Sequence, residues 1–124
     1  LRVDVVKEVA AAMKRRGVQV RVNTDGLANL VHGRDITAAL KGLVDVYSVS
    51  LNAPDAATYD RLCPSRFGAA AYDAVKAFIL AAKGHARVIA TAVALPGLDL
   101  EAVRRVAEGE LGVEFRARDF NVVG

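Results

Sequence analysis

The sequence has only one cysteine in 124 residues, whereas small secreted proteins are often rich in disulfides. A single cysteine, Cys63, excludes an internal disulfide and predicts a reducing, cytoplasmic location. Its neighbours Leu62 and Pro64 favour a structural role over a catalytic one. Charged residues interrupt every apolar run before it is long enough to cross a membrane. The first residues, LRVDVVKEV, carry charges where a signal peptide is apolar, so we expect neither a membrane span nor a leader.

The sequence also lacks the charge pattern of a nucleic-acid-binding protein and the common motifs of catalysis. Its net charge is only +3, and the basic stretches KRRG and RARD hold no aromatic residue for base stacking. No Walker loop, dinucleotide-binding fingerprint or nucleophile elbow occurs. His32 and His85 have no partner at metal-ligand spacing. We therefore expect no nucleic-acid partner, no metal ligand and no catalytic side chain in this chain.

What the sequence does have is a hydrophobic fraction of 53%, which is enough for a core. Its length of 124 residues is enough for one domain and too short for two. We expect that single domain to span residues 1–124. Periodicity and breakers predict helices over 2–16, 36–42, 53–63, 67–85 and 100–112, and strands over 18–24, 44–51, 86–95 and 113–120. Asp35, Asp55 and Asp99 precede three of the helices as candidate caps.

The alternation of strands and helices predicts the fold class. Such an order favours parallel pairing through right-handed crossovers, so we expect an α/β fold of parallel β/α units. Ligands of such sheets bind beyond the carboxyl ends of the strands. The residues to weigh are therefore the polar ones near those ends.

The strand over 44–51 has one polar and one apolar side. Because alternate side chains point to opposite faces, Ser48, Ser50 and Asn52 share a face, and Tyr47 and Val49 lie on the other, as core. Burying unpaired polar groups costs on the order of a few kcal/mol each, so a polar ligand or water must satisfy the first face. Simpler interpretations also stand: the serines can bond to neighbours in the sheet, and Asn52 can cap a helix.

Two further strand ends are polar. Asn23 and Thr24 precede an Asp-Gly dipeptide at 25–26. Arg116 and Arg118 alternate with apolar residues in the last strand. Each pair also has a structural interpretation. Asp-Gly is a strong turn signal, and charged residues commonly protect the exposed face of an edge strand.

Four segments, in this order, resemble the later part of a radical SAM protein: VRVNTDG, VDVYSVSLNAPDAATYDRLC with a helix after it, ATAVALPG and FRARDFNVVG. In that superfamily a strand ending TNG is followed by a strand like VSLDG and then by DEETYDRI. The matching residues here are 23–26, 49–52 and 55–61. The resemblance is to the group of small radical SAM proteins known as TatD-associated, and it covers essentially the whole chain.

The resemblance implies a partial, incomplete TIM-like barrel of parallel strands with outer helices. It implies a full-length parent enzyme that binds a [4Fe-4S] cluster through a CxxxCxxC loop and reductively cleaves S-adenosylmethionine to a 5′-deoxyadenosyl radical. The small polar residues at the strand ends would contact methionine and ribose, and the last strand would lie near adenine. The cofactor-binding residues implied in this way are Asn23, Thr24, Ser48, Ser50, Asn52, Arg116 and Arg118.

The sequence departs from this family at the cluster. The cluster needs three thiolates, whereas Cys63 is the sole cysteine and lies outside the expected loop, and the family's Gly-Glu motif is also missing. We therefore expect the chain to begin in the helix after the family's second strand. It would supply the ribose and adenine side of the S-adenosylmethionine site and part of the substrate pocket. Alone it is expected to be inactive and to hold neither cofactor stably.

Two other functions stay open from the sequence. The first is a non-catalytic α/β module that binds a small anionic or nucleotide-like ligand at its strand ends. The second is an interaction module, because an exposed sheet edge can pair with a second copy to form a dimer. The substrate of the radical SAM alternative, whether a small molecule or a peptide, is not identified by these residues.

Overall fold

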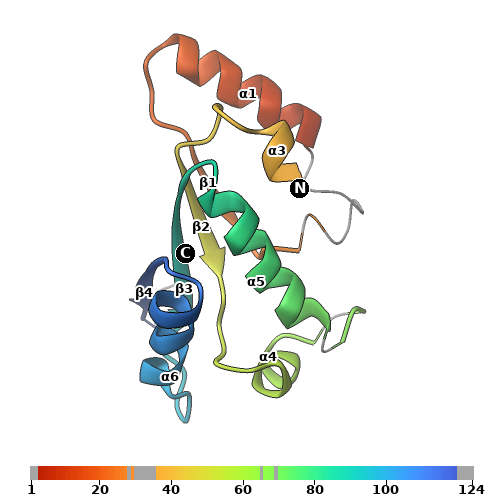
Figure 1. Cartoon of the computed structure of the whole chain (residues 1–124), viewed down its shortest axis with the longest axis vertical. Helices are drawn as coiled ribbons and strands as arrows, with labels where there is room; N and C mark the ends of the chain where they lie inside the picture. The colour runs from red at the N-terminus through yellow and green to blue at the C-terminus, as the bar shows by residue number, and fades with distance from the viewer. Residues whose placement is uncertain (1–2, 28, 30–35, 65, 69, 120–124) are drawn as a thin grey trace.

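A computed structural model of the chain describes residues 3–27, 29, 36–64, 66–68 and 70–119 (Figure 1). Its helices are α1 (Val3–Arg15), α3 (Ile36–Ala39), α4 (Ala56–Leu62), α5 (Ala70–Lys83) and α6 (Leu100–Arg104), and α6 continues into a π-helical turn, η1 (Arg105–Glu110). Its strands are β1 (Arg21–Thr24), β2 (Val46–Ser50), β3 (Arg87–Val93) and β4 (Glu114–Arg118). Within the described residues, every helix is too short or too polar to cross a bilayer.

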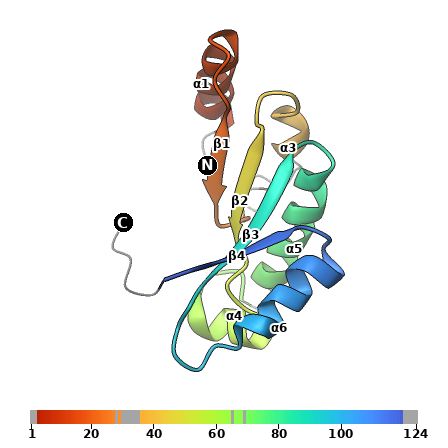
Figure 2. The ribbon, with the colours of Figure 1, turned by 90° about the vertical axis from the view of Figure 1, so that its left-hand side faces the viewer.

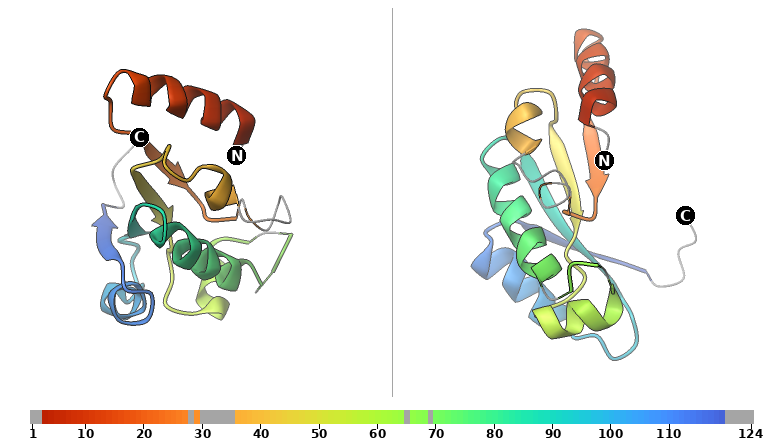
Figure 3. Two further views of the ribbon diagram at one scale, coloured as in Figure 1. Left: turned by 45° about the horizontal axis from the view of Figure 1, so that its top comes forward. Right: turned by 90° about the vertical axis from the view of Figure 1, so that its right-hand side faces the viewer.

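The four strands form one sheet in the order β1-β2-β3-β4, and every neighbouring pair is parallel. Helices α3, α5 and α6 lie on one side of it, α4 lies beyond the carboxyl end of β2, and α1 lies beyond the start of β1 (Figure 2, Figure 3). Right-handed crossovers between strands in sequential order place each connecting helix on the same side, which explains this arrangement. The predicted α/β class with parallel β/α units is therefore confirmed. The outer strands of the sheet are β1 and β4, and pairing of their edges with a second copy stays a prediction.

The hydrophobic core fills the space between the sheet and the helices on its covered side. Tyr47 and Val49 of β2 are buried there against α5, and the rings of Tyr47 and Phe78 meet edge to face with centroids 5.7 Å apart. The prediction that this side of β2 is core is confirmed. The largest fully buried side chains of this core are Tyr47, Phe78, Ile36, Leu40, Leu51, Ile79 and Leu111.

Two of the three predicted helix caps are confirmed. The Asp55 carboxylate accepts a hydrogen bond from the Thr58 amide at 2.7 Å, and Asp99 accepts one from the Ala102 amide at 3.1 Å. Each satisfies an amide that the first helical turn leaves without a partner. The third, Asp35, lies outside the described residues. The Ile36 amide, at the start of α3, donates to the side-chain oxygen of Asn29 at 2.8 Å.

The predicted helix over 100–112 differs from the observed one in its second half. Residues 105–110 widen into a π-helical turn, in which the Leu111 amide donates to the Val106 carbonyl at 2.9 Å. The wider turn keeps Val103, Ala107 and Leu111 on the buried side of the segment, where each is at most 1% exposed. Glycine at position 109 weakens the α-helical alternative. Burial of this apolar row therefore overrides regular α-helical geometry.

Candidate functional site

The register of the sheet separates two faces with different chemistry. Residues in register across parallel strands share a face, and their immediate neighbours in each strand point to the other one. The covered face holds the rows Val22, Tyr47 and Val88, then Thr24, Val49, Ala90 and Phe115. The opposite face, here called the open face because no described helix lies over it (Figure 2), holds Asn23, Ser48, Ile89 and Glu114, then Ser50, Thr91 and Arg116, then Val93 and Arg118.

This register separates Thr24 from the other candidate residues of the strands. Asn23 is exposed on the open face, whereas Thr24 points to the covered face. The Thr24 hydroxyl accepts a hydrogen bond from the Gly26 amide at 3.1 Å, and Asp25 accepts one from the Leu27 amide at 3.0 Å. The segment after β1 is therefore a tight turn, as the Asp-Gly signal predicted. Thr24 stabilises that turn, and Asn23 alone of the pair faces the candidate site.

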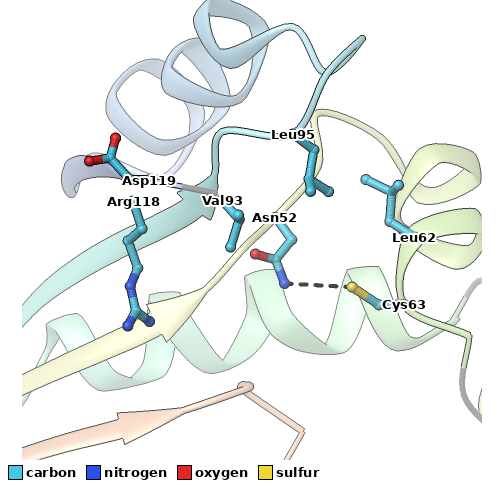
Figure 4. A pocket seen from close by; sticks show the side chains of 7 residues that line it. All are labelled: Asn52, Leu62, Cys63, Val93, Leu95, Arg118 and Asp119. Atoms are coloured by element: carbon cyan, nitrogen blue, oxygen red, sulfur yellow. Dashed lines mark hydrogen bonds between the residues drawn. The ribbon is translucent and has the colours of Figure 1, made fainter. Parts of the chain in front are cut away.

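The larger of two hollows near these residues lies at the carboxyl ends of β2, β3 and β4 (Figure 4). It has a volume of about 380 Å³, and we call it the strand-end pocket. Its lining combines apolar side chains with a few polar ones: Asn52, Leu62, Cys63, Val93, Leu95, Arg118 and Asp119. A pocket beyond the carboxyl ends of parallel strands is where ligands of such folds bind.

Asn52 shapes this pocket through an unusual backbone conformation. Its φ of 66° lies in the left-handed region, which no other non-glycine residue among those described adopts and which asparagine tolerates well. The amides of Leu51 and Asn52 both donate to the Thr91 carbonyl, at 2.9 and 3.1 Å, so the turn stays attached to β3. The side-chain nitrogen of Asn52, Nδ2, donates to the Cys63 sulfur at 3.5 Å. Asn52 is therefore a pocket residue, and Asp55 caps the following helix.

The second hollow lies on the open face itself and has a volume of about 170 Å³. We call it the sheet-face hollow. It draws on all four strands, because the twist of the sheet turns β4 across the direction of β1 (Figure 2). Its lining is polar throughout: Arg21, Asn23, Ser48, Thr91, Arg116 and Arg118. Arg118 lines both hollows, so the two adjoin, and Ser50 lies in the row of Thr91 and Arg116 without lining either one.

The charges on the open face divide into a paired and an unpaired set. Arg87 and Glu114 form a two-bond ion pair, with both nitrogen–oxygen distances at 2.7 Å. This pairing lowers the pKa of the Glu114 carboxyl and raises the pKa of Arg87. Arg21, Arg116 and Arg118 make no ion pair with any carboxylate of the described residues. The sheet-face hollow therefore carries three positive charges and no negative one among its lining residues.

Besides the apolar Leu62, Val93 and Leu95, four lining residues were not among the candidates from the sequence. Thr91 is 4% exposed, and its hydroxyl lies 3.4 Å from the Val49 carbonyl, as a donor. Arg21 lies two residues before Asn23 and so on the same face, which strand alternation extended backwards predicts. Cys63 and Asp119 reach the strand-end pocket from the end of α4 and the residue after β4. No signal in the sequence links those two segments.

The described residues offer no metal centre. They contain no group of three or more histidine, cysteine or acidic side chains that could hold an ion, and Cys63 is a free thiol. His85 precedes β3, at the end of the sheet opposite the strand-end pocket, and His32 lies outside the described residues. Comparison with known proteins returned no matching family model, curated protein or solved structure.

Proposed function

We propose that this chain is the later part of a radical SAM enzyme core and that its strand ends supply the ribose and adenine side of the S-adenosylmethionine site. The observation that carries the proposal is the winding of the sheet, with sequential parallel strands, helices on one face and a polar open face. A (β/α) barrel is wound in this way, with its inner face opposite the helices. A doubly wound sheet has helices on both faces and apolar residues on each.

The strand-end pocket has the size and lining that the cofactor's nucleoside half requires. At about 380 Å³ it falls within the range of roughly 300–1,000 Å³ typical of small-molecule sites. Val93 and Leu95 offer apolar walls for a purine, while Asn52 and Asp119 offer groups for ribose hydroxyls. An acidic side chain bonded to ribose hydroxyls is a recurrent arrangement in nucleotide sites.

The residues present do not fit the iron–sulfur cluster. Three thiolates are required, and the chain has Cys63 alone, already in contact with Asn52. The proposal therefore assigns no redox step to this chain. The cluster ligands would have to come from a segment outside the present sequence.

A second candidate function is favoured by the unpaired arginines of the open face. A non-catalytic module that binds an anionic or nucleotide-like ligand would need the same strand-end pocket and the same positive charge. It would not need cysteines elsewhere in the protein. The two candidates therefore differ in what the gene encodes before the codon for Leu1.

The first experiment reads the gene upstream of the Leu1 codon, in frame, to its start. The proposal expects a CxxxCxxC loop and, after it, a strand ending in Gly-Glu. A start codon close to Leu1 with no cysteines between would overturn the radical SAM assignment and leave the binding module.

The second experiment uses the protein encoded from that upstream start, with its cluster reconstituted under anaerobic conditions. Ser50 lines neither hollow, but it lies on the open face in the row of Thr91 and Arg116, over which the methionine half of the cofactor would extend. Ser50→Val removes its hydroxyl and should weaken S-adenosylmethionine binding by about fivefold to tenfold, as loss of one hydrogen bond does. Thr24→Val is the matched control, because Thr24 points to the covered face. Equal affinities of Ser50→Val and the parent protein would remove Ser50 from the cofactor site.

A further inference from the structure

We propose that the sheet-face hollow binds the phosphoryl group of a small-molecule ligand, with Arg21, Arg116 and Arg118 as its charged contacts. The proposal depends on this chain's own residues and holds whether or not the radical SAM assignment is correct. If that assignment is correct, the phosphorylated molecule is the substrate, because the hollow adjoins the strand-end pocket at Arg118.

The charge of the hollow favours an anion. Three arginines line it together, and among the described residues no carboxylate lies within ion-pair distance of any of them. Arg116 adds to the effect of Arg87 in lowering the pKa of Glu114 but does not pair with that carboxylate. Arg87, on the same face, shows the alternative outcome, because Glu114 neutralises it through two hydrogen bonds of 2.7 Å. Like charges held together without a counterion repel one another, so an anion that enters the hollow relieves that repulsion.

The hydrogen-bond donors of the hollow favour phosphate over carboxylate. Guanidinium groups are rigid forks of N–H donors that match the oxygens of phosphate. They reach the hollow from both outer strands, Arg21 from β1 and two arginines from β4, while Asn23 and Ser48 add neutral donors between them. Donors that approach from several directions suit a tetrahedral group with three free oxygens and a double negative charge. A planar carboxylate offers two oxygens and one charge.

The size of the hollow fits a single chemical group. At about 170 Å³ the hollow is well below the roughly 300 Å³ at which sites for whole small molecules begin, so it suits one group of a ligand. The remainder of that ligand has room in the adjoining strand-end pocket, whose lining is more apolar. Arg118 lies at the junction and would contact both parts.

The test measures binding of inorganic pyrophosphate to the purified chain by isothermal titration calorimetry at about 0.15 M salt, where weak surface attraction is largely screened. Tricarballylate, a tricarboxylate of comparable charge, is the comparison probe. We expect saturable binding of pyrophosphate with one site per chain and at least about tenfold weaker binding of tricarballylate. No binding of pyrophosphate overturns the proposal, and equal binding of the two probes overturns the assignment to a phosphoryl group.

Variants locate the site. Arg21→Gln and Arg116→Gln should each weaken pyrophosphate binding by about tenfold or more, since each removes a charged hydrogen-bond donor. Arg105→Gln removes the same charge from the covered side of the sheet, where Arg105 is exposed, and should leave the affinity unchanged. An equal loss in all three variants would mean attraction to net charge only and would overturn the site.

A near-isosteric variant keeps the test decisive if an arginine variant does not fold. Asn23→Asp places a carboxylate in the hollow at an exposed position, with almost no change of shape. It should pair with the arginines and reduce pyrophosphate affinity by about tenfold or more. Unchanged affinity in Asn23→Asp would show that pyrophosphate binds elsewhere and would overturn the proposal.

Discussion

The two faces of the sheet are built from alternate residues of the same four strands, yet they have opposite physical roles. On the covered face, Tyr47 and Val49 are buried against α5. On the open face, Ser48 is only half-buried and Arg116 is exposed. Within β2, a change of one position along the strand therefore moves from a residue that stabilises the fold to one that lines a candidate site.

The comparison also holds for the polar contacts of each face. On the covered face the buried hydroxyl of Tyr72 donates to the Ala53 carbonyl at 2.8 Å. On the open face the Arg87–Glu114 ion pair has both side chains more than half exposed. Hydrogen bonds away from water are costly to lose, whereas exposed ion pairs contribute little. Loss of the covered-face hydrogen bond should therefore lower stability more than loss of the open-face ion pair.

The largest expected effect comes from neighbouring residues of β2. Tyr47→Ala empties a fully buried aromatic site beside Phe78 and should lower the free energy of unfolding by about 3–5 kcal/mol. Ser48→Ala, one position along, should change it by less than about 0.5 kcal/mol. Urea denaturation followed by circular dichroism measures both. Comparable losses in the two variants would mean that the open face is also covered.

The next effect separates backbone conformation from packing. Gly26 and Gly97 both have positive φ, of 80° and 82°, but a Cβ on Gly26 would lie 3.1 Å from the side chains of Val49 and Val75, whereas Gly97 has open space. Gly97→Ala should cost about 1–2 kcal/mol from conformation alone. Gly26→Ala should cost about 2–4 kcal/mol, because overpacking adds to it. Denaturation midpoints compare them, and equal costs would contradict close packing of the turn.

A smaller effect belongs to the hydroxyl of Tyr72. Tyr72→Phe leaves the buried Ala53 carbonyl without its partner and should cost about 1–2 kcal/mol near pH 7. Burial raises the pKa of Tyr72 to about 12, with smaller contributions from nearby carboxylates. A raised pKa means that this contribution is full below pH 10 and is lost as pH rises through about 12. Alkaline titration should therefore show a smaller loss of stability in the variant, and identical curves would contradict this assignment.

The smallest effect is expected at the open-face ion pair. Glu114→Gln should lower stability only slightly at pH 7, because the pair is exposed to solvent. The hydrogen bond from Arg87 lowers the pKa of Glu114 below its usual 4.5, so the contribution is present above that value. As pH falls through the lowered pKa, the variant and the parent protein should become equally stable. Thermal unfolding over acidic pH measures this, and a difference that persists at low pH would contradict it.

Local sequence signals predicted most of the fold because they act over short distances. The aspartates at 55 and 99 bond to amides three residues away, and the apolar rows of α1 and α5 recur at helical spacing. The four strands were each predicted a few residues too long. Apolar residues such as Val18 and Val44 flank the strands and extend the pattern beyond the last ladder partner. Where a strand ends depends on which residues of the neighbouring strand pair with it, and a local sequence pattern does not contain that information.

The candidate site was predicted only in part, for the same reason. Alternation in β2 correctly placed Ser48 and Ser50 opposite Tyr47. The sequence-based set joined Asn23 and Thr24, which the register places on opposite faces, and it omitted Arg21. Residue type suggested which side chains bind polar groups. The pairing of the strands decided which of them share a surface.

By itself, the sequence determined the order of the described elements, the caps at Asp55 and Asp99, the parallel α/β class and the apolar side of β2, since each follows from local spacing. Tertiary structure decided that Arg21 of β1 and Arg118 of β4 line one hollow, although 96 residues separate them along the chain and the two strands do not pair. Sheet twist and one-sided crossovers bring them together, and these properties arise only when all four strands are assembled.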